Sequence, residues 1–207
     1  MKKLQRAAEL IDLIRRFGHE SALVGGLAVS ARARERFTKD VDFAVAVSTD
    51  DESEKLALSM QREGYQLTTV IEQEVHGIVG TLRFRDPRER SEEPSIDLLC
   101  GSCGIEREVV EEATFVSMAQ GIEIPVARLP HLLAMKVLSE NDVRVQDRAD
   151  IQALMHVASD AELDEARQLL QLITERGFQR EKDLGQTFSK FAQAHRQGQG
   201  NDLDLDF

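Results

Sequence analysis

Residues 23–45 read Leu-Val-Gly-Gly-Leu-Ala-Val-Ser-Ala-Arg-Ala-Arg-Glu-Arg-Phe-Thr-Lys-Asp-Val-Asp-Phe-Ala-Val. This stretch predicts a short strand, a turn at Gly25 and Gly26, a helix, and a second strand that begins near Asp40 and Asp42. Glycine lets the backbone turn tightly and approach a ligand closely. The helix after the turn points free backbone N–H groups at the gap, where they can hold a phosphate. The stretch therefore predicts a phosphate cradle beside a pair of acids.

The two acids of this stretch have a spacing that suits metal binding. Asp40 and Asp42 are two residues apart on a predicted strand, so both carboxylates leave the same face. Two carboxylates beside a phosphate cradle suit Mg²⁺ or Mn²⁺ bridging to the triphosphate of an NTP. Asp97 is the candidate third acid, because it lies inside the apolar strand 96–99, where an unpaired carboxylate is costly. A metal ion, or an acceptor hydroxyl to be deprotonated, would justify its position.

Three charged residues of the C-terminal half occupy predicted helix faces that are otherwise apolar. Lys136 lies on an apolar stripe rather than on the polar face of its helix, and Asp147 and Asp150 share a face with large apolar residues. All three are expected to point at the interior or into a cleft. Lys136 is suited to bind phosphate as a point charge, although a core lysine that extends its amine to solvent is the alternative.

A basic cluster lies between the glycines and the acids. Arg32, Arg34 and Arg36 are two residues apart, so successive side chains are about 200° apart on a helix and cannot all face one ligand. Their alternation is typical of a solvated helix face. Arg36 and Lys39, nearest the acids, are the predicted phosphate ligands and a local patch for an acceptor.

The composition excludes several classes of protein. The chain has 207 residues, of which 42% are hydrophobic and 30% charged, as in a globular protein. Its formal net charge of −11 argues against broad, salt-driven binding of nucleic acid or anionic membrane. The longest uncharged stretch, residues 21–31, is too short to span a bilayer. Arg6, Glu9 and Asp12 interrupt any signal-like apolar core, so we expect no membrane partner and a cytoplasmic location.

The hydrophobic patterns predict an α/β (α+β) fold followed by a helical part. We expect an α/β domain over residues 1–127, a helical domain packed on it over 128–196, and a disordered acidic tail over 197–207. The predicted strands are 21–24, 41–47, 66–71, 77–85, 95–99, 114–118 and 122–127. The predicted helices are 3–17, 27–36, 50–63, 105–113, 130–140, 146–158, 161–176 and 180–196.

These motifs together resemble a known family. Val24-Gly-Gly followed by Asp40-Val-Asp is similar to the signature of the nucleotidyltransferase superfamily related to DNA polymerase beta. Within it the chain resembles the AbiEii-like branch, which includes toxins of type IV toxin–antitoxin systems. The segments that carry this second resemblance are Arg36-Phe-Thr-Lys-Asp-Val-Asp, Ile96-Asp-Leu-Leu, Leu132-Leu-Ala-Met-Lys and Gln146-Asp-Arg-Ala-Asp-Ile.

The resemblance implies a metal-dependent transfer of a nucleoside monophosphate from an NTP, with release of pyrophosphate. It implies a mixed β-sheet with flanking helices that carries the metal-binding acids on neighbouring strands, and a C-terminal helical domain that closes over the nucleotide. The acceptor hydroxyl would belong to an RNA 3′ end such as that of a tRNA, a protein or a small molecule, and a cognate antitoxin is an implied partner. Gly26 departs from members that carry Ser there, so only backbone donors are available.

The resemblance implies a role for individual residues of this chain. Asp40 and Asp42 match the metal-binding acids, and Asp97 matches the third acid, which can assist the acceptor hydroxyl. The phosphate turn is matched by Gly25 and Gly26, which also stand in the sequence where a cradle is expected. The later motifs of the toxin branch, at the nucleotide, are matched by Lys136, Asp150 and, less closely, Asp147.

Other readings of the same features are weaker. A phosphatase of the haloacid-dehalogenase type needs Asp-x-Asp-x-Thr, but position 44 is Ala, and a glycosyltransferase would not need the Gly-Gly turn. Cys100-Gly-Ser-Cys103 has the spacing of a redox pair, but a turn with two incidental thiols is the preferred interpretation. The five histidines, His131 among them, lack ligand-like spacing and are interpreted as ordinary. The remaining alternative is a catalytically silent module of the same fold that binds nucleotide or a partner.

Overall fold

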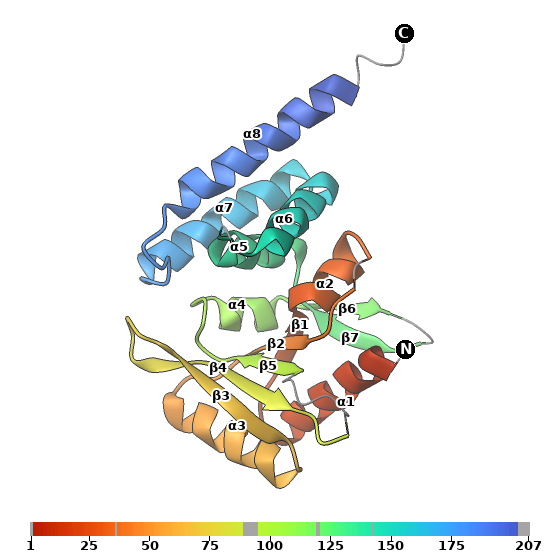
Figure 1. Ribbon diagram of the computed structural model, residues 1–207, viewed down its shortest axis with the longest axis vertical. Helices are drawn as coiled ribbons and strands as arrows, with labels where there is room; N and C mark the ends of the chain where they lie inside the picture. The colour runs from red at the N-terminus through yellow and green to blue at the C-terminus, as the bar shows by residue number, and fades with distance from the viewer. Residues whose placement is uncertain (1, 36, 89–94, 119–120, 142, 203–207) are drawn as a thin grey trace.

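The computed structural model describes residues 2–35, 37–88, 95–118, 121–141 and 143–202. The described residues form one seven-stranded mixed sheet in the order β3-β4-β5-β2-β1-β7-β6 (Figure 1). Its strands are β1 (Ser21–Val24), β2 (Val41–Val45), β3 (Gln66–Gln73), β4 (Ile78–Arg85), β5 (Ile96–Leu99), β6 (Thr114–Ser117) and β7 (Glu123–Val126).

The central strands place the acids of two distant segments side by side. β2 runs antiparallel to β1 and parallel to β5, and Asp42 lies opposite Asp97 in that parallel register. In β2, Val41 and Phe43 are buried on the other face from Asp42. In β5, Ile96 is likewise buried on the face opposite Asp97. The buried apolar residues therefore fix the face that each aspartate occupies.

Helices cover both faces of the sheet. α1 and α3 pack on one face, and α2 and α4 lie on the other, beneath the bundle of α5 to α8 (Figure 1). α3 begins at the cap Thr49, whose side chain accepts from the backbone N–H of Glu52, and α7 begins with a capping box of Ser159 and Glu162. The helices are α1 (Lys2–Arg16), α2 (Gly25–Arg32), α3 (Asp50–Arg62), α4 (Glu106–Glu111), α5 (Leu129–Ser139), α6 (Val145–Val157), α7 (Asp160–Glu175) and α8 (Leu184–Asp202).

Side chains tie the helical bundle to the sheet. His76, at the β3–β4 turn, stacks on Phe178, which follows α7, with ring centroids 4.1 Å apart. Arg176 donates from Nη2 to Glu108 of α4 at 2.6 Å. These contacts lie at one side of the interface and hold the bundle over the face of the sheet that carries Asp42 and Asp97.

The structure confirms the predicted α/β fold and corrects two local predictions. The helix predicted over 27–36 begins at Gly25 and ends at Arg32, because the chain must turn back to enter β2. The last predicted helix continues beyond residue 196: residues 197–202, expected in the tail, belong to α8, and 203–207 lie outside the described residues. The predicted boundary between 127 and 128 falls between β7 and α5. Within the described chain, no helix combines the length and apolarity needed to cross a bilayer.

Candidate active site

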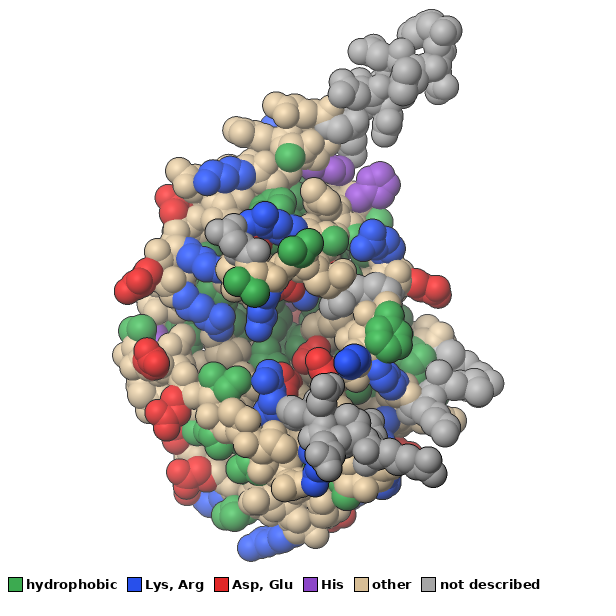
Figure 2. All heavy atoms as spheres, viewed as in Figure 1, with side chains coloured by type: hydrophobic (Ala, Val, Ile, Leu, Met, Phe, Trp, Pro, Cys, Tyr) green, Lys and Arg blue, Asp and Glu red, His purple; other side chains and the backbone are tan. Residues whose placement is uncertain are grey.

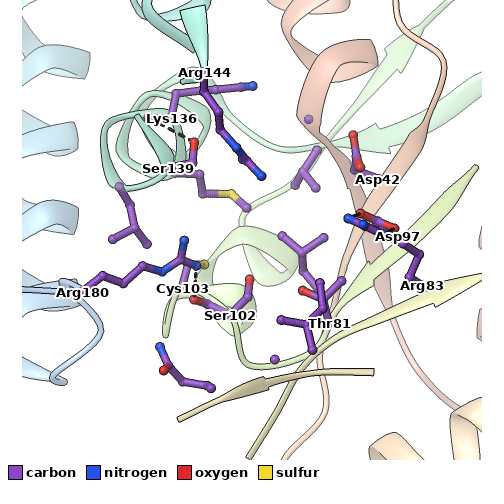
Figure 3. A pocket seen from close by; sticks show the side chains of 18 of the residues that line it. Asp42, Thr81, Arg83, Asp97, Ser102, Cys103, Lys136, Ser139, Arg144 and Arg180 are labelled. Atoms are coloured by element: carbon purple, nitrogen blue, oxygen red, sulfur yellow. Dashed lines mark hydrogen bonds and ion pairs between the residues drawn. The ribbon is translucent and has the colours of Figure 1, made fainter. Parts of the chain in front are cut away.

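A cleft of about 370 Å³ lies between the sheet and the helical bundle (Figures 2 and 3). One wall comes from β1, β2, β3, β4 and β5 and the loop after β5, and the opposite wall comes from α5 and the loops after α5 and α7. Both walls carry charge, with carboxylates on the sheet side and cationic side chains around the opening. The polar residues that line it include Asp42, Thr81, Arg83, Asp97, Ser102, Lys136, Ser139, Arg144 and Arg180.

Asp42 projects into the cleft from β2 over the start of α2. Gly25 has φ +63°, and a Cβ atom built there would lie 1.9 Å from Oδ2 of Asp42. A side chain at position 25 would therefore need strained backbone and would displace the carboxylate. The Gly-Gly turn thus has a reason besides phosphate binding, since it makes room for Asp42.

The charge of Asp42 is poorly compensated. Desolvation, followed by the nearby charges of Asp97 and Asp40, raises the pKa of Asp42 to about 7. A backbone hydrogen bond from Gly26 and the positive charge of Lys136 act in the opposite direction. In the part of the chain that the structure describes, no lysine or arginine lies within ion-pair distance of this carboxylate.

Asp97 has a cationic partner that the sequence did not reveal. Arg83, opposite it on β4, donates from Nε and Nη2 to the two carboxylate oxygens at 2.8 and 2.7 Å. This bidentate geometry fixes both side chains. The available signal was the alternation of β4, which places Arg83 on the face opposite Leu82 and Phe84. Only the strand order could show that Arg83 meets Asp97.

Lys136, Asp147 and Asp150 form one ionic cluster, which we call the lysine cluster. The Lys136 amine lies 2.6 Å from Oδ1 of Asp147 and 2.8 Å from Oδ2 of Asp150. Ser139 donates to the other oxygen of Asp147 at 3.0 Å. The two carboxylates are 9% and 1% exposed, so their burial depends on the ammonium between them. The helix faces predicted from the sequence are therefore right, and α5 and α6 bring these residues together.

Two more arginines reach the cleft from the helical side. Figure 3 shows Arg144 and Arg180 pointing into the cavity from the wall that faces Asp42 and Asp97. Arg180 donates to the carbonyl of Ser102 at 2.9 Å, and Arg144 is 61% exposed. Arg144 precedes α6, and Arg180 precedes α8, which begins at Leu184 rather than at the predicted residue 180. Neither lies on a face that the hydrophobic periodicity marks, so the sequence does not predict them.

Other predicted site residues lie outside the cleft lining. Asp40 is exposed just before β2, and its pKa is raised by partial desolvation and by the charge of Asp97. Lys39 is exposed beside it and partly offsets that shift. Arg36 lies outside the described residues. Arg32 donates to the carbonyls of Ala127 and Val126 at 3.0 and 2.9 Å, so it fastens α2 to β7.

The cysteine pair has the environment of structural thiols. Cys100 and Cys103 are free and buried. Burial raises the pKa of Cys100 to about 12 and raises the pKa of Cys103 well above its usual value. Because the thiolate is the reactive form, these shifts disfavour redox chemistry, in agreement with the preferred interpretation of the sequence.

The match to a known family agrees with this geometry. Residues 12–202 match the family described as nucleotidyl transferase AbiEii toxin of type IV toxin–antitoxin systems. The chain belongs to the AbiEii family. It is therefore a transferase of the nucleotidyltransferase type, and the resemblance inferred from the sequence is confirmed. No curated protein is similar enough to count as a match.

Solved structures resemble this AbiEii-family chain in fold. An antigenic nucleotidyltransferase-like protein from Paracoccidioides brasiliensis has a TM-score of 0.52 at 18% identity, covering 90% of this chain and 91% of that one. The antibiotic-resistance factor ANT(2'')-Ia has a TM-score of 0.49 at 15% identity, covering 85% and 94%. The lincosamide antibiotic adenylyltransferase LnuA has a TM-score of 0.47 at 14% identity, covering 76% and 98%. At these identities the likeness concerns the fold, and the first structure carries it.

The sheet wall of the cleft fits a divalent metal ion. Asp42 offers carboxylate oxygens, the donors that Mg²⁺ and Mn²⁺ prefer. The pKa of Asp42 is raised by burial and by the neighbouring carboxylates, and a bound cation would stabilise its ionised form. Asp97 retains lone pairs beyond those used by Arg83, because each carboxylate oxygen accepts more than one bond. Asp42 is thus the first candidate ligand, with Asp97 and Asp40 beside it.

Proposed function

We propose that this chain transfers a nucleoside monophosphate from an NTP to an acceptor hydroxyl in the cleft, with Mg²⁺ or Mn²⁺ bound at Asp42, Asp97 and Asp40. The observation that carries the proposal is the register of β2 with β5, which sets Asp42 beside Asp97 at the wall of a cleft. Family membership supports the reaction type. Such a metal supplies charge neutralisation of the triphosphate and orients it for in-line displacement.

The residues of the opposite wall are suited to the triphosphate. Arg144 and Arg180 point into the cavity, and arginine forks match phosphate oxygens. Lys136 lines the same cavity and uses two of its three donors on the lysine cluster, which leaves one for a phosphate oxygen. Gly25 at the start of α2 offers its backbone N–H group to the same ligand, whereas the N–H of Gly26 donates to Asp42.

The transfer itself exchanges a phosphoanhydride bond of the NTP for a phosphoester bond to the acceptor. An acceptor oxygen attacks the α-phosphorus, the bond from that phosphorus to the bridging oxygen breaks, and pyrophosphate leaves. The hydroxyl proton passes to a base, for which Asp97 is positioned at the cleft and held rigid by Arg83. Arg83 and the cations opposite also oppose the negative charge that accumulates on the phosphates.

The family also supports a biological role as the toxin of a type IV toxin–antitoxin pair. In that role the chain modifies an acceptor in the cell and has a cognate antitoxin as partner. Induced expression should slow growth, and Asp42→Asn should remove the effect while the protein still accumulates. Growth inhibition that is equal for the variant would show that the toxicity does not depend on transfer.

A screen with labelled nucleotides tests the proposed activity. The protein is incubated with each α-labelled NTP, Mg²⁺ or Mn²⁺, and in turn total RNA, a protein extract and a small-molecule extract. We expect metal-dependent label on one class of acceptor, and no label when the γ-phosphate carries it. Metal-dependent NTP binding without transfer to any acceptor would favour the silent binding module, and the absence of binding would overturn both.

A further inference from the structure

A buried histidine outside the cleft has no hydrogen-bond partner. His131 of α5 is 0% exposed, and within the described chain neither of its ring nitrogens is hydrogen-bonded. Buried polar atoms in folded proteins nearly always have a partner, so each exception needs an explanation. The mechanism proposed for the cleft does not use His131.

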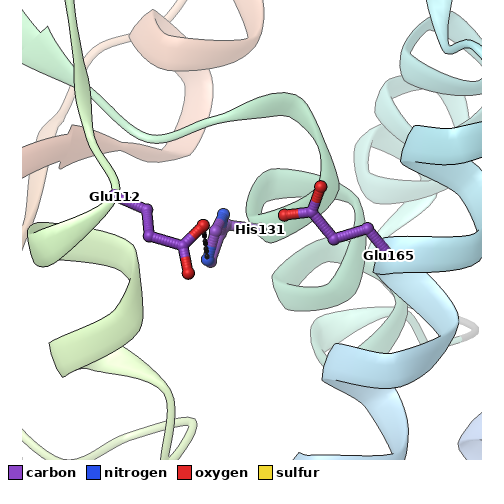
Figure 4. Close-up of side chains that lie close together, drawn as sticks. All are labelled: Glu112, His131 and Glu165. Atoms are coloured by element: carbon purple, nitrogen blue, oxygen red, sulfur yellow. Dashed lines mark ion pairs between the residues drawn. The ribbon is translucent and has the colours of Figure 1, made fainter.

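Two glutamates surround this ring. Glu112 caps the C-terminus of α4 and Glu165 belongs to α7, and one ligand atom from each of the three residues lies within 4.8 Å of the others. The His131 Nε2 atom is 3.9 Å from Oε2 of Glu112, too far for a hydrogen bond. Figure 4 shows the imidazole between the two carboxylates. The three side chains therefore converge on one point from three separate helices.

Arg128 orders the two glutamates without satisfying the histidine. Its Nη1 atom donates to Glu112 and to Glu165 at 2.6 Å each, and Nη2 donates to Glu165 at 2.7 Å. With His131 neutral, the group of four side chains has a net charge of −1. Each carboxylate oxygen has a second lone pair beyond the one that Arg128 uses. A positive ion can therefore still be accepted beside the guanidinium.

We propose that Glu112, His131 and Glu165 bind a divalent transition-metal ion, with Zn²⁺ as the best fit, at a site separate from the cleft. One imidazole and two carboxylates suit Zn²⁺ or Mn²⁺, whereas Mg²⁺ favours oxygen ligands alone. Ligand bonds of about 2.0–2.2 Å require the three side chains to close by about an ångström. Glu112 is 48% exposed, which provides a path for entry and room for a water ligand.

The position of the site gives the ion a structural consequence. Glu112 follows the helix that packs on β1 and β2, whereas His131 and Glu165 belong to the helical bundle. An ion held by all three would join the end of α4, on the sheet side, to α5 and α7 of the helical bundle. We therefore expect the metal to stabilise the folded chain.

Metal binding is tested in an Asp42→Asn background, so that the proposed cleft metal does not contribute. The full chain is stripped with a chelator and titrated with Zn²⁺ by calorimetry and with Co²⁺ by visible absorption. We expect one equivalent of Zn²⁺, an increase in Tm that grows with Zn²⁺ concentration, and Co²⁺ bands. Because this readout involves no NTP, its failure is distinguishable from failure of the proposed transferase.

Two variants remove ligands while keeping the fold. His131→Phe replaces an unpartnered ring by an apolar one, and Glu165→Gln keeps an oxygen for Arg128. Each should weaken Zn²⁺ binding about 100-fold and abolish the rise in Tm, with the metal-free Tm of His131→Phe unchanged or higher. His156→Gln, at an exposed histidine near His195, is the matched control and should bind normally. No Zn²⁺ binding, or equal binding by the ligand variants, would overturn the proposal.

Discussion

Two pairs of aspartates are neutralised in different ways: Asp147 with Asp150 in the helical bundle, called the helical pair, and Asp42 with Asp97 on the sheet, called the sheet pair. On the helical side, Lys136 lies between Asp147 and Asp150 and contacts both at ion-pair distance. On the sheet side, Arg83 engages Asp97 alone, and Asp42 is left with a pKa raised to about 7. The helical pair has two cationic partners, because Arg144 also lies 3.7 Å from Asp147, whereas the ion pairs of the described residues give the sheet pair Arg83 alone. From this difference we propose a structural role for the helical pair and ligand binding for the sheet pair.

The largest expected effect is on transfer when the sheet pair is changed. Asp42→Asn removes the uncompensated charge and should lower the rate of label transfer about 1,000-fold or more, corresponding to about 4 kcal/mol. Initial rates with saturating Mg²⁺ measure this. Asp51→Asn, which alters an exposed carboxylate of α3, is the matched control and should transfer at the normal rate. Equal loss in both variants would contradict the assignment.

Substitutions at the helical pair and its lysine should change the stability of the fold. Lys136→Met removes the cation that Asp147 and Asp150 share, leaving Asp147 only the exposed Arg144 at 3.7 Å, and should lower the free energy of unfolding by about 3–5 kcal/mol. Adding Asp147→Asn and Asp150→Asn to that variant should restore most of the loss. Denaturant unfolding measures both, and Lys55→Met, which breaks an exposed ion pair on α3, should be silent. A lysine that only bound phosphate would show no such rescue.

How far the sequence predicted the site can be seen in these same residues. Strand alternation predicted the face of Asp42, and the cost of a lone carboxylate inside an apolar strand singled out Asp97. Helical periodicity placed Lys136, Asp147 and Asp150 inward, so all these predictions come from local patterns. Arg83 was missed because its partner depends on the order of β4 and β5, which is a long-range property. Arg144 was missed because connecting segments carry no periodicity.

The same reason explains what the sequence could not show about His131. Spacing along the chain says nothing of ligands from three helices, and Glu112, His131 and Glu165 meet only in the folded structure. For the predicted tail, only residues 197–202 are corrected: they extend α8 to Asp202 although several of them have a weak intrinsic helix preference. The positions of the strands along the chain were otherwise well predicted, because their apolar runs are short and clearly bounded.

A single methyl group at position 25 would occupy the space that the Asp42 carboxylate fills. Gly25→Ala places a Cβ atom 1.9 Å from the Asp42 carboxylate and should lower transfer about 100-fold, near 2.7 kcal/mol. Gly18→Ala is the control, because Gly18 also has positive φ but a Cβ there meets nothing within 4 Å. Both variants carry the same kind of backbone strain, so only the first should lose activity beyond its loss of stability.

The uncompensated charge also predicts a pH dependence of stability. The pKa of Asp42 is about 7 in the folded chain and 3.8 by reference, so folding favours its protonated form. Its effect is absent below about pH 4 and grows to a destabilisation of about 1–3 kcal/mol above pH 7. In chelator, Asp42→Asn should become progressively more stable than the parent over this range. A difference that does not change with pH would contradict the prediction.

The smallest expected effect on transfer concerns Arg83, which pairs with Asp97. Arg83→Lys keeps the charge but loses the fork to Asp97 and should reduce transfer about 10-fold, near 1.4 kcal/mol. Arg83→Gln should be worse, because the charge is lost as well. A rise in KM with unchanged kcat in both variants would instead place Arg83 in uniform binding of the nucleotide.

Calorimetric titration of NTP in the presence and absence of Mn²⁺ compares the two pairs most directly. Asp42→Asn and Asp147→Asn are measured beside the parent chain, at a pH above 7. We expect Mn²⁺ to strengthen NTP binding in the parent and in Asp147→Asn, and to have no effect in Asp42→Asn. Metal dependence that survives in Asp42→Asn and disappears in Asp147→Asn would contradict the assignment of the metal to the sheet pair.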